Sequence, residues 1–149
     1  MIIPVLKASE KFLPDIFEIN NAVQGNPWSL ANLRLELEIP NGLSWVTTDA
    51  AGKATGYLFA RSVGESAELL VIGVRSDYMR QNIGKTLVTA LLKTCTEISC
   101  KTVFLEVSVR NTGAIEFYRH LGFQIYMTRP QYYRDGTDAL CMKLELAKP

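Results

Sequence analysis

The sequence predicts a mixed α/β domain with antiparallel strands toward both ends of the chain and one parallel crossover in the middle. A dense apolar run, residues 66–74 ("SAELLVIGV"), has the composition of a strand that is covered on both faces. A helical apolar period follows this run, and residues 101–109 ("KTVFLEVSV") form a second strongly β-prone run. Strand, helix and strand in this order imply a parallel crossover, and the shorter β-prone runs on either side predict antiparallel strands.

Two helices are expected before the first clear strand. The first begins near Phe12, because apolar residues recur at helical spacing and Pro14 is tolerated in a first turn. The second begins after Ser29, a residue type that caps helix N-termini well. Trp28, which precedes this cap, is expected to pack on Leu33 as a hydrophobic staple.

The remaining elements follow from changes in the apolar period. Residues 43–48 and 54–63 form a predicted β-hairpin around the turn residues "DAAGK". The crossover helix is predicted from five residues at helical spacing: Ile83, Leu87, Leu91, Leu92 and Cys95. A short helix lies within residues 111–123 and stops at Gly122. The last two strands flank the loop "PQYYRDG" and cover residues 123–129 and 137–146.

Size and charge narrow the class of protein. A chain of 149 residues with 48% hydrophobic composition predicts one domain, residues 1–149, with a single core. The 16 basic and 15 acidic residues leave a net charge of +1, so no overall field favours nucleic acid or a membrane surface. The N-terminus has no basic leader, and no segment approaches the roughly 18 apolar residues of a membrane span, so we expect a cytoplasmic protein. The 3 cysteines form no C-x-x-C pair, which indicates buried thiols in a reducing compartment and no metal site.

The connection "SDYMRQNIGKTL", residues 76–87, joins the first crossover strand to the crossover helix. Ligands of such sheets bind at the carboxyl ends of the strands, where this connection lies. Backbone N–H groups of a concave turn and of a helix N-terminus can hold a pyrophosphate whatever the side chains are. Such turns usually carry an early glycine, and Asn82 belongs to the few other residue types that adopt left-handed conformations readily.

Motifs around this turn resemble the GNAT superfamily of acyl-CoA-dependent N-acyltransferases. The most specific is "N-x-x-A-I-x-F-Y-x-x-L-G-F", Asn111 to Phe123, and the resemblance covers nearly the whole chain in the expected order. Within the superfamily the chain is most similar to the RimI-type ribosomal-protein alanine N-acetyltransferases. Four further motifs carry this similarity: "NPWS" at 26–29, "LEV" at 105–107, "R-x-x-Y-Y" at 129–133 and "DALCM" at 138–142. The resemblance implies a mostly antiparallel central sheet with one splayed parallel strand pair, flanked by about four helices.

Amide formation from a thioester needs a neutral amine, a stabilised oxyanion and a proton for the departing thiolate. Glu106 interrupts an apolar and β-branched run, so its exposure to a cleft or a partner is expected. The resemblance implies that Glu106 is the general base, and the alternative is an edge glutamate facing solvent. Spacing alone assigns Tyr118 to the core, whereas the resemblance implies a general acid for the coenzyme A thiolate. Asn111 caps the short helix, bonds the pantetheine arm, or does both.

The superfamily turn, written Q/R-x-x-G-x-G/A, falls here on Met79, Asn82 and Gly84. Met79 cannot donate the hydrogen bond of a glutamine or arginine, so we expect weaker acetyl-CoA binding. Asn82 replaces the glycine well if the demand is on φ, and crowds the phosphate if the demand is on space. Arg80 and Lys85 either add charge to the anion site or form a solvated basic corner. The expected acetyl-CoA-binding set is Ile72, Gly73, Val74, Arg80, Gln81, Asn82, Ile83, Gly84, Lys85, Thr86, Asn111 and Tyr118.

The acceptor side is expected to be a groove for an extended N-terminal peptide. Trp28, Tyr132 and Tyr133 are expected to wall this groove, with Glu68 and Leu70 nearby where the strand enters the cleft. Aromatic packing in the core is the alternative for these rings.

The resulting hypothesis is a monomeric, metal-independent enzyme that passes acetyl from acetyl-CoA directly to an N-terminal α-amine, as the enzymes acting on alanine of a small-subunit ribosomal protein do. About a tenth of a free α-amine is neutral at pH 7, against well under a thousandth of a lysine side chain, so a carboxylate base suits this acceptor. Direct attack is expected because no thiol or serine lies with a base. The alternatives are the same fold acting on a small-molecule amine, and a non-catalytic acyl-CoA-binding module.

Overall fold

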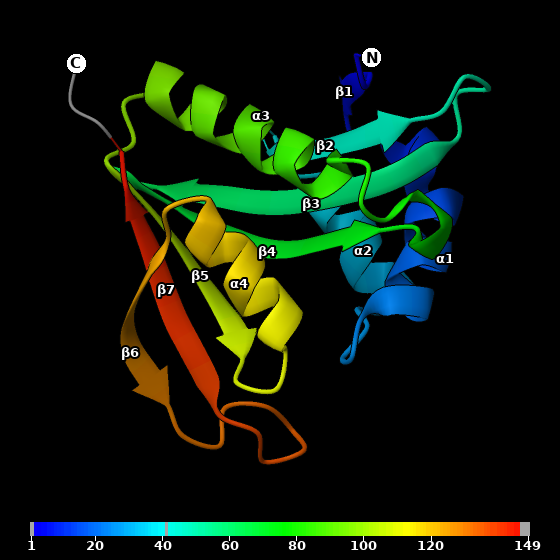
Figure 1. Cartoon of the computed structure of the whole chain (residues 1–149). Helices are drawn as coiled ribbons and strands as arrows, with labels where there is room; N and C mark the ends of the chain where they lie inside the picture. Colours follow the sequence, from blue (N-terminus) through cyan, green and yellow to red (C-terminus); the bar gives the residue numbers. More distant parts are fainter. Residues whose placement is uncertain (1, 41, 147–149) are drawn as a thin grey trace.

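The computed structural model describes residues 2–40 and 42–146, and apart from one short first strand its helices and strands follow the order that the apolar periods predict. The strands are β1 (Val5–Lys7), β2 (Leu43–Thr48), β3 (Ala54–Val63), β4 (Ser66–Val74), β5 (Thr102–Ser108), β6 (Gln124–Arg129) and β7 (Ala139–Glu145). The helices are α1 (Leu13–Val23), α2 (Leu30–Leu37), α3 (Ile83–Glu97) and α4 (Thr112–His120), with short 3-10 helices η1 (Glu10–Phe12) and η2 (Ser76–Tyr78). Figure 1 shows these elements arranged around one central sheet.

The sheet has the strand order β1-β2-β3-β4-β5-β7-β6. Its neighbouring strands are antiparallel except β4 and β5, which are parallel and are joined through α3. This arrangement confirms the expected fold class, a mostly antiparallel sheet with one parallel pair. The crossover helix α3 lies on one face of the sheet, as a parallel connection requires (Figure 1).

The parallel pair separates halfway along its length. The ladder between β4 and β5 runs from Ser66 opposite Thr102 to Leu69 opposite Leu105 and stops there. At the same point the register between β3 and β4 shifts, because Ala60 pairs with Leu69 whereas the preceding residue of β3 pairs with Val71. The residue between them is an extra residue in β4, and such bulges bend a strand and increase its twist. The carboxyl ends of β4 and β5 therefore diverge and open the sheet.

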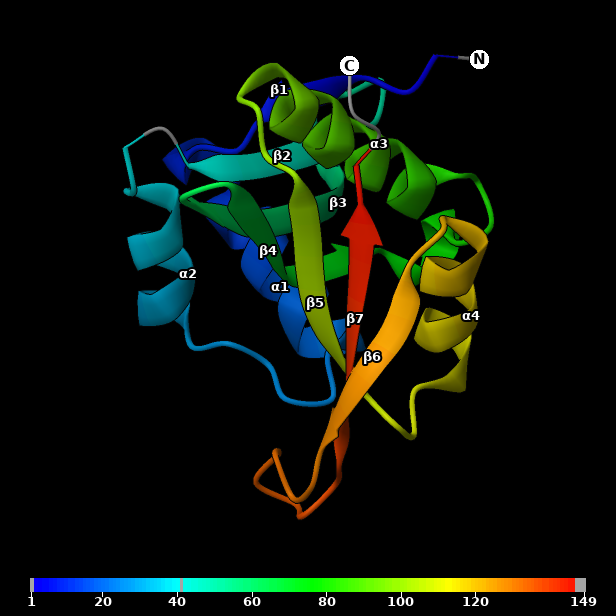
Figure 2. The same cartoon turned by 90° about the vertical axis from the view of Figure 1, so that its left-hand side faces the viewer.

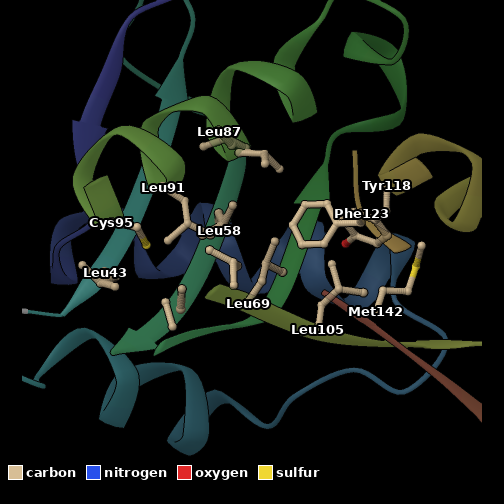
Figure 3. Packing of buried hydrophobic residues seen from close by; sticks show 14 of the residues in the cluster. Leu43, Leu58, Leu69, Leu87, Leu91, Cys95, Leu105, Tyr118, Phe123 and Met142 are labelled. Atoms are coloured by element: carbon tan, nitrogen blue, oxygen red, sulfur yellow. The ribbon is translucent and has the colours of Figure 1, made fainter. Parts of the chain in front are cut away.

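Two apolar clusters cover the two faces of the sheet. Residues of α3 and α4 pack on one face, where the leucines of α3 lie over β3 and β4 and where Tyr118, Phe123 and Met142 continue the cluster (Figure 3). Residues of α1 and α2 pack on the other face, against Tyr57 and Phe59 of β3. This second layer stops at β4: Figure 2 shows β5, β7 and β6 between α2 and α4 with no helix in front of them. One half of the sheet thus has an uncovered face.

Local signals determined the helices correctly. Pro14 lies in the first turn of α1, and the Ser29 side chain accepts a hydrogen bond from the Asn32 backbone N–H at 3.1 Å. The Trp28 ring lies 5.9 Å from that of Phe59, in the apolar cluster that contains Leu33. The three-residue strand β1 was not predicted, because a pairing that short leaves no period in the sequence. Among the described residues, no helix has the length and apolarity needed to cross a bilayer.

Candidate active site

The divergence of β4 and β5 produces a cleft of about 570 Å³ at their carboxyl ends. Seven of the residues singled out in the sequence line this cleft: Trp28, Leu70, Ile72, Glu106, Asn111, Tyr118 and Tyr133. They come from four separate parts of the chain: the connection before α2, strand β4, strand β5 with the following α4, and the loop before β7. The fold therefore brings the expected base and the expected acid to one opening.

Glu106 lies in the middle of β5 and points away from the main core. Burial alternates along this strand, so that Leu105 and Val107 face the core while Glu106 faces the uncovered side. Its side chain is 21% exposed, and its carboxylate lies 3.4 Å from the Nε atom of Arg129. Glu106 also borders a second hollow of about 420 Å³ on the uncovered face, together with Glu68. A half-buried carboxylate at a cleft mouth matches what the sequence predicts for this residue.

Tyr118 belongs both to the core and to the cleft. It is 6% exposed, and its ring lies 5.3 Å from that of Phe117 and 5.7 Å from that of Phe123 (Figure 3). Burial raises the pKa of Tyr118 well above its ordinary value, with a smaller contribution from Tyr133. The phenol therefore remains protonated at neutral pH, as a proton donor must. The core packing that spacing predicts is confirmed, and Tyr118 also lines the cleft, where the general-acid role stays a prediction.

Asn111 caps α4, which was one of its two expected roles. Its Oδ1 atom accepts a hydrogen bond from the Ala114 backbone N–H at 3.1 Å. The Nδ2 group makes no hydrogen bond to any other described residue, although Asn111 lines the cleft. The side chain can therefore cap the helix with one atom and bind a ligand with the other.

The exposed edge of β4 differs in detail from expectation. The Arg75 N–H donates to Thr55 in β3 at 2.9 Å, so by strand alternation Gly73 also directs its backbone groups to β3. Of the three residues expected here, only Ile72 and Val74 therefore direct their N–H and C=O groups away from β3, and Ile72 lines the cleft. A Cβ at Gly73 would lie 2.5 Å from the ring of Tyr57, so packing alone requires glycine here.

Gln24 occupies part of this edge and was not singled out in the sequence. Its Nε2 atom donates to the Ile72 carbonyl at 2.7 Å and to the Tyr57 hydroxyl at 3.2 Å. A polar residue at a helix end gives no sequence signal for such a contact, because Gln24 and Ile72 are 48 residues apart. The carbonyl of Ile72, a member of the expected acetyl-CoA-binding set, therefore already has a donor.

The turn before α3 adopts the conformation that a glycine usually provides. Asn82 is the N-cap of α3 with φ 64° and ψ 19°, in the left-handed region, and its side chain makes no capping hydrogen bond. Arg80 has a positive φ of 65° as well. The first bond of the helix runs from the Thr86 N–H to the Asn82 carbonyl at 2.9 Å, so the N–H groups before Thr86 have no helical acceptor. A hollow of about 410 Å³ lies against Asn82 and Thr86.

Side chains of this turn contribute less than its backbone. Ile83 is 4% exposed and packs in the main core, so only its backbone N–H can contact a ligand. A Cβ at Gly84 would lie 3.2 Å from the Phe117 ring, so close packing against α4, and not only a ligand, accounts for this glycine. Arg80 and Lys85 are exposed and form no ion pair with the other described residues, which leaves both of their interpretations open.

The expected acceptor residues gather on the uncovered side. Trp28, Tyr132 and Tyr133 line a hollow of about 960 Å³ between the start of α2 and the loop before β7, and the two tyrosine rings lie 5.1 Å apart. Trp28 also packs on Phe59, so the core interpretation of this ring is partly correct. Arg61 lines the same hollow and forms an ion pair with the buried Glu36, a pair that the sequence analysis missed.

The described residues contain no cluster of three or more histidine, cysteine or acidic side chains that could hold a metal ion. All three cysteines are buried free thiols. Burial raises the pKa of the Cys95 thiol to about 12, so this thiol is not a nucleophile near neutral pH.

Comparison with known proteins gives consistent similarities. The acetyltransferase (GNAT) family matches residues 13–123. The [ribosomal protein bS18]-alanine N-acetyltransferase of Escherichia coli is 30% identical over 138 residues, which cover 91% of this chain and 92% of that protein. N-alpha-acetyltransferase daf-31 of Caenorhabditis elegans is 31% identical over 113 residues, or 71% of this chain and 62% of that protein. The crystal structure of the ribosomal-protein-S18-alanine N-acetyltransferase from Escherichia coli superposes with a TM-score of 0.90 at 28% identity, covering 99% of this chain and 96% of that one. These similarities confirm the resemblance that the motifs predict.

Proposed function

This chain belongs to the acetyltransferase (GNAT) family, and from that premise we propose that it transfers acetyl from acetyl-CoA to the N-terminal α-amine of a protein. The acceptor that we place first is alanine of a small-subunit ribosomal protein, after the relative from Escherichia coli. The observation that carries the proposal is the meeting of Glu106 and Tyr118 at the opening between β4 and β5.

The described residues fit acetyl-CoA at this opening. The backbone of Val74, the Nδ2 group of Asn111 and the N–H groups at the start of α3 supply donors and acceptors that acetyl-CoA can use. Asn82 caps the 15-residue helix α3 without a side-chain hydrogen bond, so the first-turn N–H donors of this helix are available to an anion. This arrangement supports pantetheine beside β4 and pyrophosphate at the turn.

The chemistry is a direct acyl transfer. Acetyl-CoA supplies a thioester carbonyl carbon; the amine nitrogen bonds to it, the carbon–sulfur bond breaks, and the electron pair of that bond leaves with the sulfur. Glu106 accepts the proton that the nitrogen loses, and Tyr118 donates a proton to the departing sulfur. The buried position of Tyr118 keeps its phenol protonated for this step, while Glu106 faces the side from which a peptide enters.

The acceptor side supports a peptide more than a small amine. The hollow at Trp28, Tyr132 and Tyr133 is about 960 Å³, and Trp28 and Tyr133 also line the cleft that contains Glu106. A groove of this kind suits an extended chain, with the α-amine at Glu106 and the following residues along the aromatic walls. A single chain provides every residue of this site, so we propose that a monomer is active.

The test compares acetyl acceptors and two variants. We expect turnover of acetyl-CoA with an alanine-started peptide and much slower turnover with polyamines or aminoglycosides. Glu106→Gln should lower kcat about 10²- to 10⁴-fold, and Tyr118→Phe, which keeps the ring, should lower it about 10²-fold, with acetyl-CoA affinity unchanged in calorimetry. Activity only on the small amines would contradict a peptide acceptor and would indicate a small-molecule acetyltransferase. Tight coenzyme A binding without acetyl transfer to any amine would indicate a non-catalytic binding module.

A further inference from the structure

The proposed base Glu106 is in contact with a cation supplied by another strand. Arg129 is the last residue of β6, and its Nε atom lies 3.4 Å from an Oε atom of Glu106. The Arg129 guanidinium also lies 5.9 Å from the centre of the Tyr132 ring. The Arg129 side chain is 49% exposed and lines the hollow on the uncovered face that Glu106 also borders. The contact is therefore part of the site and not of the core.

The other described side chains that surround the Glu106 carboxylate are tyrosines, a thiol and a second carboxylate. Tyr126, Tyr132 and Tyr133 surround it from β6 and the following loop, and their pKa values are all raised, by burial or by the carboxylate itself. They are neutral at pH 7. The thiol of Cys141 in β7 lies opposite Glu106 in the register, and Glu68 in β4 adds a second carboxylate on the same hollow. Within residues 2–40 and 42–146, Arg129 is the only cation within 4.0 Å of the Glu106 carboxylate.

An isolated carboxylate at this place has a chemical disadvantage. About nine tenths of a free α-amine is an ammonium ion at pH 7, and a carboxylate binds the ammonium form better than the neutral form. The ammonium nitrogen has no lone pair and cannot attack a thioester. A site that holds its base as an unpaired anion therefore favours the unreactive form of its own substrate.

We infer that Arg129 is a positioning residue whose positive charge makes the site select the neutral form of the acceptor amine. The inference rests on the proposed function, because it concerns the amine at Glu106. The positive charge of Arg129 weakens the attraction between the Glu106 carboxylate and an incoming ammonium ion. The same contact holds the carboxylate on the uncovered side of β5. The base function survives this pairing, since the nitrogen becomes cationic and far more acidic once it has attacked, and a carboxylate of modest basicity can then take its proton.

The first measurement is the dependence of kcat on pH with an alanine-started peptide. The rising limb of kcat reports the ionisation of groups in the bound complex, whereas kcat/KM reports the free amine and free enzyme. In Arg129→Gln we expect the midpoint of the kcat limb to rise by about 0.5 to 1 pH unit, a modest shift because solvent screens a half-exposed pair. Arg129→Lys keeps the charge and should keep the midpoint near that of the wild type.

The second measurement is independent of turnover. Calorimetry of the same peptide in the presence of coenzyme A, which has no acetyl group to transfer, gives the affinity at pH 6 and at pH 9. The ratio of these affinities is decisive, because a merely structural defect lowers both. We compare the affinity of Arg129→Gln with that of the wild type at each pH. This ratio of affinities should be about 3- to 10-fold higher at pH 6, where the amine is an ammonium ion, than at pH 9. The matched control is Lys143→Gln, which removes a cation of the same face that pairs with Glu145 at 3.4 Å and does not contact Glu106.

The outcomes separate the two proposals. A wild-type protein that neither binds nor acetylates the peptide contradicts the proposed function and the inference with it. Peptide binding by the wild type, with the same ratio and the same kcat midpoint in Arg129→Gln, overturns the inference and leaves the function intact. An equal change in Lys143→Gln also overturns it, because the effect would then belong to the overall charge of the face and not to the contact with Glu106.

Discussion

Replacing Asn82 tests whether the turn before α3 depends on backbone conformation or on space. Asn82 has φ 64° and ψ 19°, a conformation that costs most L-residues about 1–2 kcal/mol, but costs glycine almost nothing and asparagine little. Its side chain is exposed and makes no capping hydrogen bond, so no side-chain bond is lost on substitution. Asn82→Gly should therefore change acetyl-CoA affinity by less than about twofold and stability by about 0.5 kcal/mol or less.

Asn82→Ala should behave differently. Alanine pays the full left-handed cost of about 1–2 kcal/mol, so the turn relaxes and must be rebuilt when the pyrophosphate binds. At about 1.4 kcal/mol per tenfold, this weakens acetyl-CoA binding about 5- to 30-fold, which calorimetry resolves easily. The control is Ser99, which also has a φ of 64° but lies beyond the other end of α3. Ser99→Gly should raise stability in urea unfolding by about 1 kcal/mol and leave the affinity unchanged.

Two results would refute this reasoning about φ. A tenfold tighter binding by Asn82→Gly would show that the asparagine side chain crowds the phosphate, so that space and not conformation limits affinity. Wild-type affinity in Asn82→Ala would show that the left-handed turn is not needed by the ligand.

Three further predictions concern the edges of the site. Gly73→Ala should lower the free energy of unfolding by about 1–3 kcal/mol, because its Cβ would meet the fully buried Tyr57 ring at 2.5 Å. Gly25→Ala is the control: a Cβ there meets no atom within 4 Å, so the free energy of unfolding should change by about 0.5 kcal/mol at most. Urea unfolding of both variants measures the difference. Met79→Gln should tighten acetyl-CoA binding by about two- to tenfold in calorimetry, since it introduces a hydrogen-bond donor at a residue that is 52% exposed. Unchanged affinity would show that residue 79 does not contact acetyl-CoA. The hydrogen bond to the Glu106 carboxylate raises the pKa of Tyr132 to about 12. The stability that this bond contributes is therefore present below pH 10 and is lost as the pH rises through 12. In Glu106→Gln, an absorbance titration should show one tyrosine ionising closer to pH 10.

Features that depend on neighbouring residues could be predicted from the sequence. The helical periods located α1 and α3, Ser29 predicted the start of α2, and the run around Glu106 marked a glutamate expected to face a cleft or a partner. The motif that ends at Phe123 identified the family, and Asn82 could be named as the residue that would have to take a left-handed conformation. Each of these is a property of a few consecutive residues, so it leaves a trace that can be read along the chain.

The tertiary structure alone decided how distant segments meet. The extra residue in β4 and the early end of its ladder with β5 create the cleft, and neither has a signature in the sequence. Arg129 reaches Glu106 only because β6 pairs with β7 and β7 with β5, and Gln24 reaches Ile72 only because α1 ends beneath β4. Strand register and the packing of remote elements set these contacts, and a shift of one residue would turn the same side chains to the opposite face. The sequence thus named the proposed base, the proposed acid and the turn, whereas the fold decided that Arg129 lies beside the proposed base.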